Sequence, residues 1–416
     1  MKNDSLRICA VDRFRGFAVL VMIIIQIWRD FYSLELLSRL GNHKAGLGLT
    51  IINGLQFADV FAPMFLFAVA LTYKLSYDNR IKEFGKKETI KHFLKRYISL
   101  IGIGGIIRAI ESILFYFSKG RFEHTIDPFF FFGLFILLLI VFIWVVLKLF
   151  KKRNNENLNK IISITSKIIF GMVAYIAFLC LVATARDFFI QIVFHKKYSE
   201  FQIWGYWEAL QAIGAAGLVT LMFIKLKNSQ RFIVATVLLI GYSLFHESGN
   251  NSDIISVYAQ QGGFIGIIGQ SCILLFGTVL AELFFADPNR LTKYLLAIPG
   301  FGLAAVIALH YILPTMRSVS PSYILLNVFI SGSVFLLFKL YDYINLKFDI
   351  LELLGKNALL MYILQYILVY GTKEIIGYQY INNASDLFAI SFTFIMLFIM
   401  IFIAFLLDKK RIIVKL

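Results

Sequence analysis

The chain has 416 residues; 59% are hydrophobic and 16% are charged, with 41 Lys and Arg against 25 Asp and Glu. A mean hydropathy of +0.77 is too high for a surface that faces water, which excludes a soluble multidomain protein. The net charge of +16 would suit a nucleic-acid-binding protein, but the basic residues lie in short stretches between apolar segments instead of on one soluble face. We therefore expect an integral membrane protein that binds no nucleic acid.

Apolar segments recur from one end of the chain to the other. Each needs about 20 residues to cross a hydrocarbon core about 30 Å thick. They predict one all-α domain over residues 1–416, a polytopic bundle of about 12 membrane-spanning helices with a range of about 10–12. The predicted spans are 14–32, 55–77, 96–117, 129–149, 162–184, 204–226, 231–246, 262–285, 293–313, 322–340, 357–372 and 386–407.

Charge in the short loops predicts how these helices are oriented. A run rich in Lys and Arg from Lys82 to Arg96 separates the second and third spans, and the positive-inside rule assigns it to the cytoplasm. Both termini are then predicted to lie in the cytoplasm, and the first outward loop is 33–54. The alternate loops agree, with further basic clusters at 151–153, 225–231, 290–293 and 409–411.

Cysteine usage predicts no metal centre. Cys9, Cys180 and Cys272 stand singly, without the paired spacing of a zinc site or a redox motif. We expect them to be packing residues.

Polar side chains inside the predicted spans are the first candidates for function, because an ionisable group there costs roughly 2.5–3.5 kcal/mol on insertion scales. Gln26 lies near the outer end of the first span, and Asn53 and Asp59 lie at the outer end of the second. Arg108 and Glu111 are one turn apart in the third span. Their spacing indicates either a local ion pair or part of a cavity.

Two histidines are placed for acid-base chemistry, which imidazole performs well near neutral pH. His43 lies in the first outward loop, and His246 ends the seventh span and is followed by Glu247. A buried, hydrogen-bonded structural histidine is the alternative interpretation of both.

Several motifs resemble those of a known family. Val-Asp-Arg-Phe-Arg-Gly at 11–16 resembles the Leu-Asp-x-Phe-Arg-Gly opening of transmembrane acyltransferases. The second span adds three strings that are similar to the heparan-α-glucosaminide N-acetyltransferase family: Asn-Gly-Leu at 53–55, Ala-Asp at 58–59 and Phe-Ala-Pro-Met-Phe-Leu-Phe at 61–67. Three further segments follow in the family's order: Leu-Gln-Ala-Ile-Gly at 210–214, Ser-Pro-Ser-Tyr-Ile-Leu at 320–325 and Leu-Gly-Lys-Asn-Ala-Leu at 354–359. The resemblance to the family is weakest at 118–200.

The resemblance implies an acetyltransferase embedded in the membrane that acts across it. Acetyl-CoA would donate the acetyl group from the cytoplasm, and an amino sugar or glycan on the other side would accept it. The family's key histidine lies in the first outward loop, where this chain has His43. The family's asparagine near the end of the first span corresponds to Gln26, and Gln365 stands where the family often has a histidine. No metal is implied, and the composition, rich in Lys, Ile and Asn, suggests a bacterial inner membrane.

Acyl transfer from a thioester needs a base or nucleophile and donors for the oxyanion. We assign the first role to His43, as a base or as an acetyl carrier, with Asp59 orienting its ring. Gln26 or Asn53 would donate to the oxyanion.

The acyl donor carries phosphates, so its site should be basic. Arg13 and Arg15, at the mouth of the first span, are suited to bind it, with Arg108 deeper and Asn357 holding the cavity.

Three alternatives remain at this stage. The chain could be a related O-acyltransferase of surface polysaccharide, a transporter or flippase, or a relative without catalytic activity. Bundles of this kind often pair through exposed faces, so a homodimer is the assembly to test.

Overall fold

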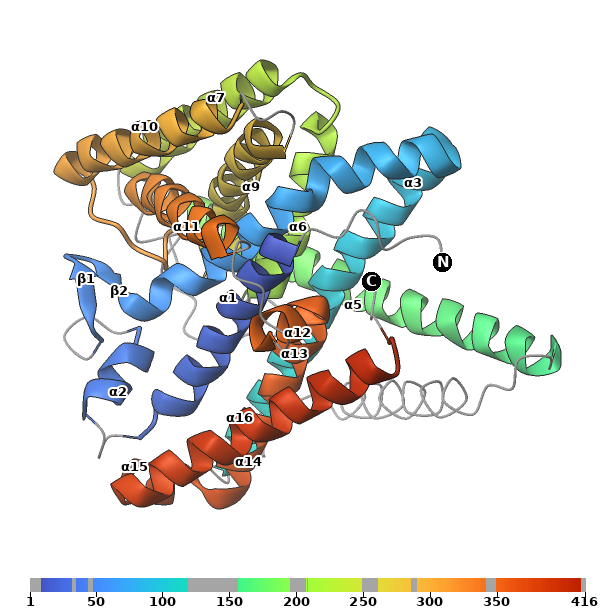
Figure 1. The fold of residues 1–416 in the computed structure, drawn as a ribbon, viewed down its shortest axis with the longest axis vertical. Coiled ribbons are helices and arrows are strands. Elements are labelled where there is room, and N and C mark those ends of the chain that lie inside the picture. Colours follow the sequence, from blue (N-terminus) through green and yellow to red (C-terminus); the bar gives the residue numbers. More distant parts are fainter. Residues whose placement is uncertain are drawn as a thin grey trace.

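A computed structural model describes residues 9–31, 35–43, 48–118, 156–194, 207, 209–248, 261–285, 290–341 and 349–412 of the chain. Apart from a two-stranded antiparallel hairpin, the regular elements of these residues are helices (Figure 1). The predicted all-α class is therefore confirmed.

The described residues of the first half contribute five helices, a 3-10 turn and the hairpin. They are α1 (Cys9–Trp28), α2 (Glu35–Gly41), β1 (Thr50–Ile52), β2 (Leu55–Gln56), a 3-10 turn (Phe57–Val60), α3 (Phe61–Ser118), α5 (Glu156–Phe194) and α6 (Ala209–Phe223).

The second half contributes the remaining long helices and one broken helix. These are α7 (Asn228–Glu247), α9 (Gly263–Phe285), α10 (Arg290–Tyr311), α11 (Pro321–Tyr341), α12 (Ile350–Lys356), α13 (Ala358–Gln365), a π-helical segment (Tyr366–Tyr370), α14 (Gly371–Ile376), α15 (Tyr378–Asn382) and α16 (Asp386–Lys409).

Six helices of the described part are long and apolar enough to cross a membrane, or seven if α12 and the helix after it, bent by 87°, count as one span. The predicted span 129–149 lies outside the described residues, and each of the other predicted spans overlaps a helix. Helices α6 and α1 are not among the six, because α6 has only 15 residues and α1 carries three charged side chains near its start. The total of about 12 spans and the cytoplasmic position of the termini stay predictions.

Helix α3 is bent into two arms at Gly85, which has a φ of +76°. Glycine adopts this left-handed conformation without a steric penalty. The two arms, seen in Figure 1 as a bend at the upper right, correspond to the predicted second and third spans. The basic segment 78–95 between them is helical apart from the bend at Gly85, and the pair of Glu88 with Lys91, three positions apart, supports the helix there.

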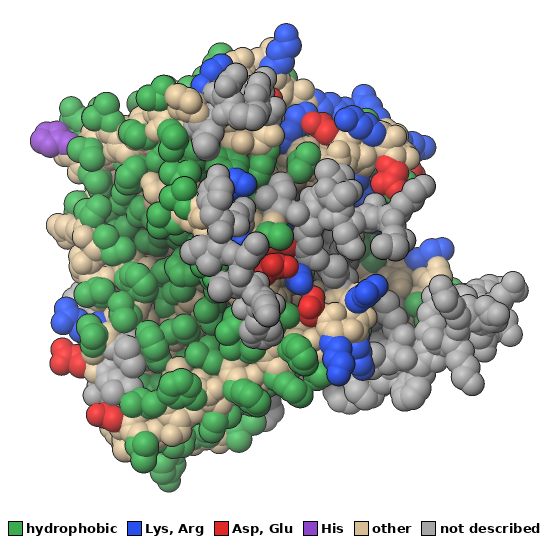
Figure 2. All heavy atoms as spheres, viewed as in Figure 1, with side chains coloured by type: hydrophobic (Ala, Val, Ile, Leu, Met, Phe, Trp, Pro, Cys, Tyr) green, Lys and Arg blue, Asp and Glu red, His purple; other side chains and the backbone are tan. Residues whose placement is uncertain are grey.

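The outer faces of several helices are apolar. Large hydrophobic side chains on α7, α10 and α16 are exposed, among them Val237, Val306 and Phe394. In Figure 2 hydrophobic side chains cover most of the left and lower part of the visible face, and Lys and Arg gather toward the top and right. Apolar surface of this extent is unfavourable in water and suits contact with lipid chains.

Helix α1 lies at the centre of the bundle and crosses α12 at very short range. A Cβ on Gly16 would lie 1.8 Å from the carbonyl oxygen of Leu351, and one on Gly355 would lie 1.7 Å from that of Asp12. Only glycine permits both approaches, because the two backbones touch. The glycines of the first and last family-like motifs thus form one helix crossing.

Candidate active site

The segment after α2 brings His43 to Asp59. Nδ1 of His43 lies 2.7 Å from Oδ1 of Asp59, in hydrogen-bond and ion-pair range. The carboxylate is 4% exposed and the imidazole 36%, so the ring reaches from a buried anchor toward the surface. With Nδ1 bonded to the carboxylate, Nε2 is the nitrogen available for proton transfer.

Main-chain contacts hold Asp59 in place from two directions. Its second carboxylate oxygen accepts a hydrogen bond of 3.0 Å from the backbone N–H of Gln56. Its own carbonyl accepts one of 2.8 Å from the hydroxyl of Tyr323, at the start of α11. Both side-chain oxygens are therefore engaged, and the orientation of the carboxylate is fixed.

Gln56 and Tyr323 are site residues that the sequence analysis did not single out. A glutamine three residues before an acidic residue, just ahead of an apolar helix, is the spacing of a helix-start motif and could have indicated Gln56. Tyr323 lies 264 positions after Asp59. No local pattern could have connected them.

Asn53 and Gly54 form the two-residue turn of the β1–β2 hairpin, in which Ile52 pairs with Leu55. Gly54 has a φ of +91°, which suits the Asn-Gly sequence of tight hairpins. A Cβ on Gly54 would lie 2.6 Å from the carbonyl oxygen of Pro314, so the turn packs against the connection between α10 and α11. The structure places Asn53 at the exposed tip of the hairpin, whereas Gln56 at its base contacts Asp59.

Gln26 lies at the C-terminal end of α1, where its carbonyl accepts a hydrogen bond of 2.7 Å from Nζ of Lys373. The same ammonium contacts the carbonyl of Ile27 at 2.8 Å and the carboxylate of Asp30 at 2.7 Å. A cation here complements the partial negative charge of a helix C-terminus. The Gln26 side chain is half-buried.

Helix α2 joins this end of α1 to the His43–Asp59 pair. A Cβ on Gly41 would lie 2.8 Å from the carbonyl oxygen of Ile25, so α2 ends against the last turn of α1. His43 follows two positions later and therefore lies near the end of α1 that carries Gln26.

The predicted donor-binding residues lie elsewhere. Arg13 forms an ion pair with Asp349, and its guanidinium lies 4.9 Å from the ring centroid of Tyr341. Arg15 donates to Oγ1 of Thr72 at 2.5 Å.

The other two also have places in the packing. Arg108 is half-buried in the second arm of α3. Asn357 sits at the break between α12 and α13 and donates a hydrogen bond of 3.0 Å to the carbonyl of Ile412.

Arg13, Arg15 and Asn357 lie at the start of α1 or beside α12, which crosses it there, away from His43. Arg15 precedes Ile25 by about ten positions of one helix, or about 15 Å at 1.5 Å per residue. The basic end of α1 and the His43–Asp59 pair are thus separated along the helix axis.

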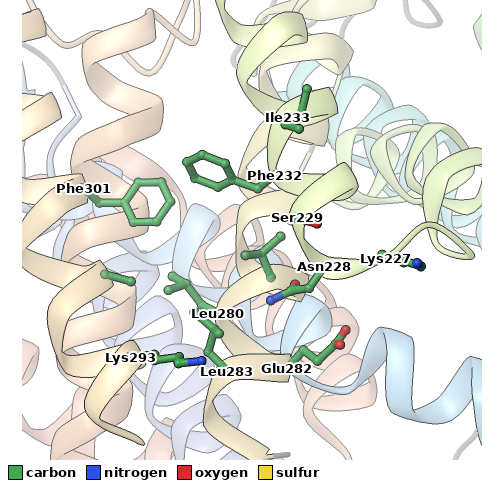
Figure 3. Close-up of a pocket in the computed structure, with 12 residues that line it drawn as sticks. Lys227, Asn228, Ser229, Phe232, Ile233, Leu280, Glu282, Leu283, Lys293 and Phe301 are labelled. Atoms are coloured by element: carbon green, nitrogen blue, oxygen red, sulfur yellow. The ribbon is translucent and has the colours of Figure 1, made fainter. Parts of the chain in front are cut away.

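A cavity of about 620 Å³ lies between α7, α9 and α10 (Figure 3). Phe232 and Phe301 line one end of it, and Lys293 and Glu282 lie at the other. Glu282 forms an ion pair with the buried guanidinium of Arg231. None of the predicted site residues lines this cavity. Its lining residues are Lys227, Asn228, Ser229, Phe232, Ile233, Val279, Leu280, Glu282, Leu283, Lys293, Ala297 and Phe301.

A metal site is not visible in the part of the chain that the structure describes. No three His, Cys, Asp or Glu side chains among those residues are grouped to hold an ion.

A bundle of long apolar helices with exposed hydrophobic faces defines the class as an integral membrane protein. Residues 7–171 match the family described as heparan-alpha-glucosaminide N-acetyltransferase, catalytic. The resemblance drawn from the motifs is confirmed over those residues, which include His43, Asp59 and Arg15 but not Asn357. A comparison with curated proteins found no significant match.

Proposed function

We propose that the protein transfers acetyl from acetyl-CoA on the cytoplasmic side of a bacterial inner membrane to an amino sugar or glycan on the other side. The observation that carries this proposal is the His43–Asp59 pair at 2.7 Å, within the region that matches the acetyltransferase family. An imidazole oriented by a fixed carboxylate is the arrangement that acyl transfer uses for its base.

The base mechanism follows from the geometry of the pair. Nε2 of His43 takes a proton from the acceptor's amine or hydroxyl as that group attacks the thioester carbonyl. The bond between carbon and sulfur breaks, and the CoA thiolate recovers a proton from the imidazolium. Asp59 stabilises the positive ring meanwhile, and the Gln56 N–H keeps the carboxylate aligned.

A two-step mechanism uses the same atoms. Nε2 of His43 attacks the thioester first, CoA leaves, and the acetyl-histidine passes its acetyl group to the acceptor. In both mechanisms we assign hydrogen-bond donation to the oxyanion to the Gln26 side chain, because α2 brings the His43 segment to that end of α1. Asn53, at the hairpin tip, is the weaker choice.

Donor binding fits the opposite end of α1. Arg15 supplies a positive charge there that contacts Thr72 and lies 3.7 Å from Asp12, and guanidinium groups suit phosphates. Arg108 would extend this basic site. Arg13 and Asn357 would position this donor site indirectly. Arg13 pairs α1 with Asp349, and Asn357 bonds the α12–α13 break to the carbonyl of Ile412.

The acetyl group could be transferred to an amine or to a hydroxyl of the acceptor, and either group must lose a proton. Gln365, buried where the family often has a histidine, cannot accept a proton at neutral pH, which leaves the proton transfer to His43. A hydroxyl acceptor would make the protein a polysaccharide O-acetyltransferase with the same pair.

The test uses purified protein in proteoliposomes with acetyl-labelled acetyl-CoA and two acceptor panels, amino sugars and sugars with hydroxyls only. Wild type should label at least one panel, and His43→Ala should lose that labelling. His310→Ala is a matched control, because His310 is exposed on α10. Label retained on wild type without an acceptor would favour the acetyl-histidine. Substrate transport without acetylation would favour a transporter and contradict the proposal.

A further inference from the structure

A second cluster of acid-base groups lies at the end of α7. Nδ1 of His246 is 2.9 Å from Oε1 of Glu247, and Nε2 is 2.9 Å from Oγ of Ser318. Carboxylate, imidazole and hydroxyl therefore stand in series, which is the relation of orienting group, base and nucleophile in acyl-transfer triads. Ser318 is 1% exposed and His246 3%.

The turn that carries Ser318 is held in an unusual conformation. Val319, the next residue, has a φ of +52°, which a β-branched side chain rarely adopts. The methyl groups of Val319 pack against two glycines. A Cβ on Gly262 would lie 2.8 Å from Cγ2 of Val319, and a Cβ on Gly269 would lie 3.0 Å from its Cγ1. The carbonyl of Ser318 accepts a hydrogen bond of 2.5 Å from Tyr242. Such over-determined backbone strain concentrates at functional sites.

Neighbouring serine contacts reinforce the turn. Oγ of Ser320 accepts a hydrogen bond of 3.0 Å from the backbone N–H of Thr315 and donates one of 3.0 Å to the carbonyl of Leu313. The alignment of Ser318 with His246 is therefore set before any substrate binds, which lowers the reorganisation needed for reaction.

This cluster is separate from the His43–Asp59 pair. Its members lie outside residues 7–171, which match the acetyltransferase family. The α10–α11 connection carries Ser318, packs against Gly54 through Pro314 and leads to Tyr323, so it contributes to both sites.

We propose that Ser318 is a nucleophile that cleaves small acyl esters, with His246 as its base and Glu247 as the positioning residue. Oγ of Ser318 attacks the ester carbonyl while its proton passes to Nε2 of His246. The ester C–O bond breaks, and the leaving alcohol takes that proton. Water, deprotonated by His246, then hydrolyses the acyl-serine to release the acid. The enclosure of Ser318 restricts the acyl group to a small one such as acetyl.

The experiment treats full-length protein in detergent with a fluorophosphonate probe and, separately, with p-nitrophenyl acetate. Peptide mass spectrometry should find the probe on Ser318, and Ser318→Ala and His246→Gln should each lower ester hydrolysis at least 100-fold. Glu247→Gln should lower the rate at least tenfold and shift its pH profile. Ser243→Ala, on the same helix, is the matched control and should retain the wild-type rate.

Folding of each variant is checked by its elution in size-exclusion chromatography. If Ser318→Ala does not fold, Ser318→Cys provides a second test, because its thiol should react with iodoacetamide at least tenfold faster than the thiol of Ser318→Cys combined with His246→Gln. Folded wild type that takes no probe on Ser318, or equal thiol rates, would overturn the proposal and leave a structural hydrogen-bond cluster. Neither reagent contains CoA, so a failure of acetyl transfer at His43 would not affect this result.

Discussion

The hydroxyl of Tyr323 donates a hydrogen bond of 2.8 Å to the main-chain carbonyl of Asp59, and both residues are buried. This bond joins the first turn of α11 to the 3-10 turn that carries the carboxylate. It gives the Ser-Pro-Ser-Tyr-Ile-Leu segment at 320–325 a role in supporting the site from a distant part of the chain.

Tyr323→Phe should weaken this support while preserving the ring's packing. The Asp59 carbonyl would lose its partner, so we expect the free energy of unfolding to fall by about 1 kcal/mol. The kcat for acetyl transfer should fall with little change in the KM for acetyl-CoA, because the proposed donor site lies at the other end of α1. Denaturant unfolding and steady-state kinetics check both effects. An unchanged kcat would mean that the bond does not position Asp59.

The close crossing of α1 and α12 should not tolerate a single added methyl group. Gly16→Ala and Gly355→Ala each place a Cβ within 2 Å of a carbonyl oxygen, so we expect a loss of about 3 kcal/mol or more. The measurement is the yield of monodisperse protein and its Tm. Gly241→Ala on α7 is the control, because no atom lies within 4 Å of its added Cβ. Equal Tm values for all three variants would contradict this packing.

Lys373 should contribute strongly to stability because its side chain is fully buried. Lys373→Met leaves Asp30 and the last carbonyls of α1 without the ammonium, and breaking such a buried pair costs about 3–5 kcal/mol. The partly exposed pair of Lys74 and Asp78 provides the comparison, since Lys74→Met should cost only about 0.3–0.5 kcal/mol. A double-mutant cycle with Asp30→Asn measures the coupling. Additive effects of the two changes would contradict the buried pair.

Arg13 and Arg15 should differ although they stand two positions apart. Arg13→Gln breaks the ion pair with Asp349 and should lower Tm. Because Arg13 only positions the proposed donor site, its loss should raise the KM for acetyl-CoA less than the loss of Arg15 does. Arg15→Gln should raise that KM roughly tenfold, the effect of losing one charge-assisted contact of about 1.5 kcal/mol. Isothermal titration with CoA measures the binding directly. Unchanged CoA binding in Arg15→Gln would remove this residue from the donor site.

Hydropathy and loop charge predicted the helices because lipid-facing surfaces must be apolar along a whole span. They failed where a polar residue is buried with partners. Lys373 directly follows the predicted span 357–372, where hydropathy alone suggests a solvated side chain. Its ammonium is instead buried against the end of α1, because helix C-terminal carbonyls and Asp30 replace its water. The basic segment 78–95 was expected as a loop, and helix-favouring spacing of its charges makes it helical.

The candidate site was only partly predictable for a related reason. His43 and Asp59 were named because polar residues at span ends stand out in an apolar sequence. Asp59 was expected to orient the His43 ring because acyl transfer needs an oriented base. The contact of His246 with Ser318 was not expected, because packing brings these two chain segments together and spacing along the sequence carries no information about such a pair. Asn53 was named as an oxyanion donor, but its Asn-Gly sequence also predicts the hairpin turn that the structure shows.

The most direct test of the His43–Asp59 assignment is the release of CoA thiol from acetyl-CoA by wild type and Asp59→Asn, each in proteoliposomes with an acceptor. An asparagine keeps the size of the side chain but favours the wrong imidazole tautomer and cannot balance the imidazolium. We expect Asp59→Asn to bind CoA normally and to release thiol about 10²–10⁴-fold more slowly. Equal rates of thiol release by the two proteins would contradict the account.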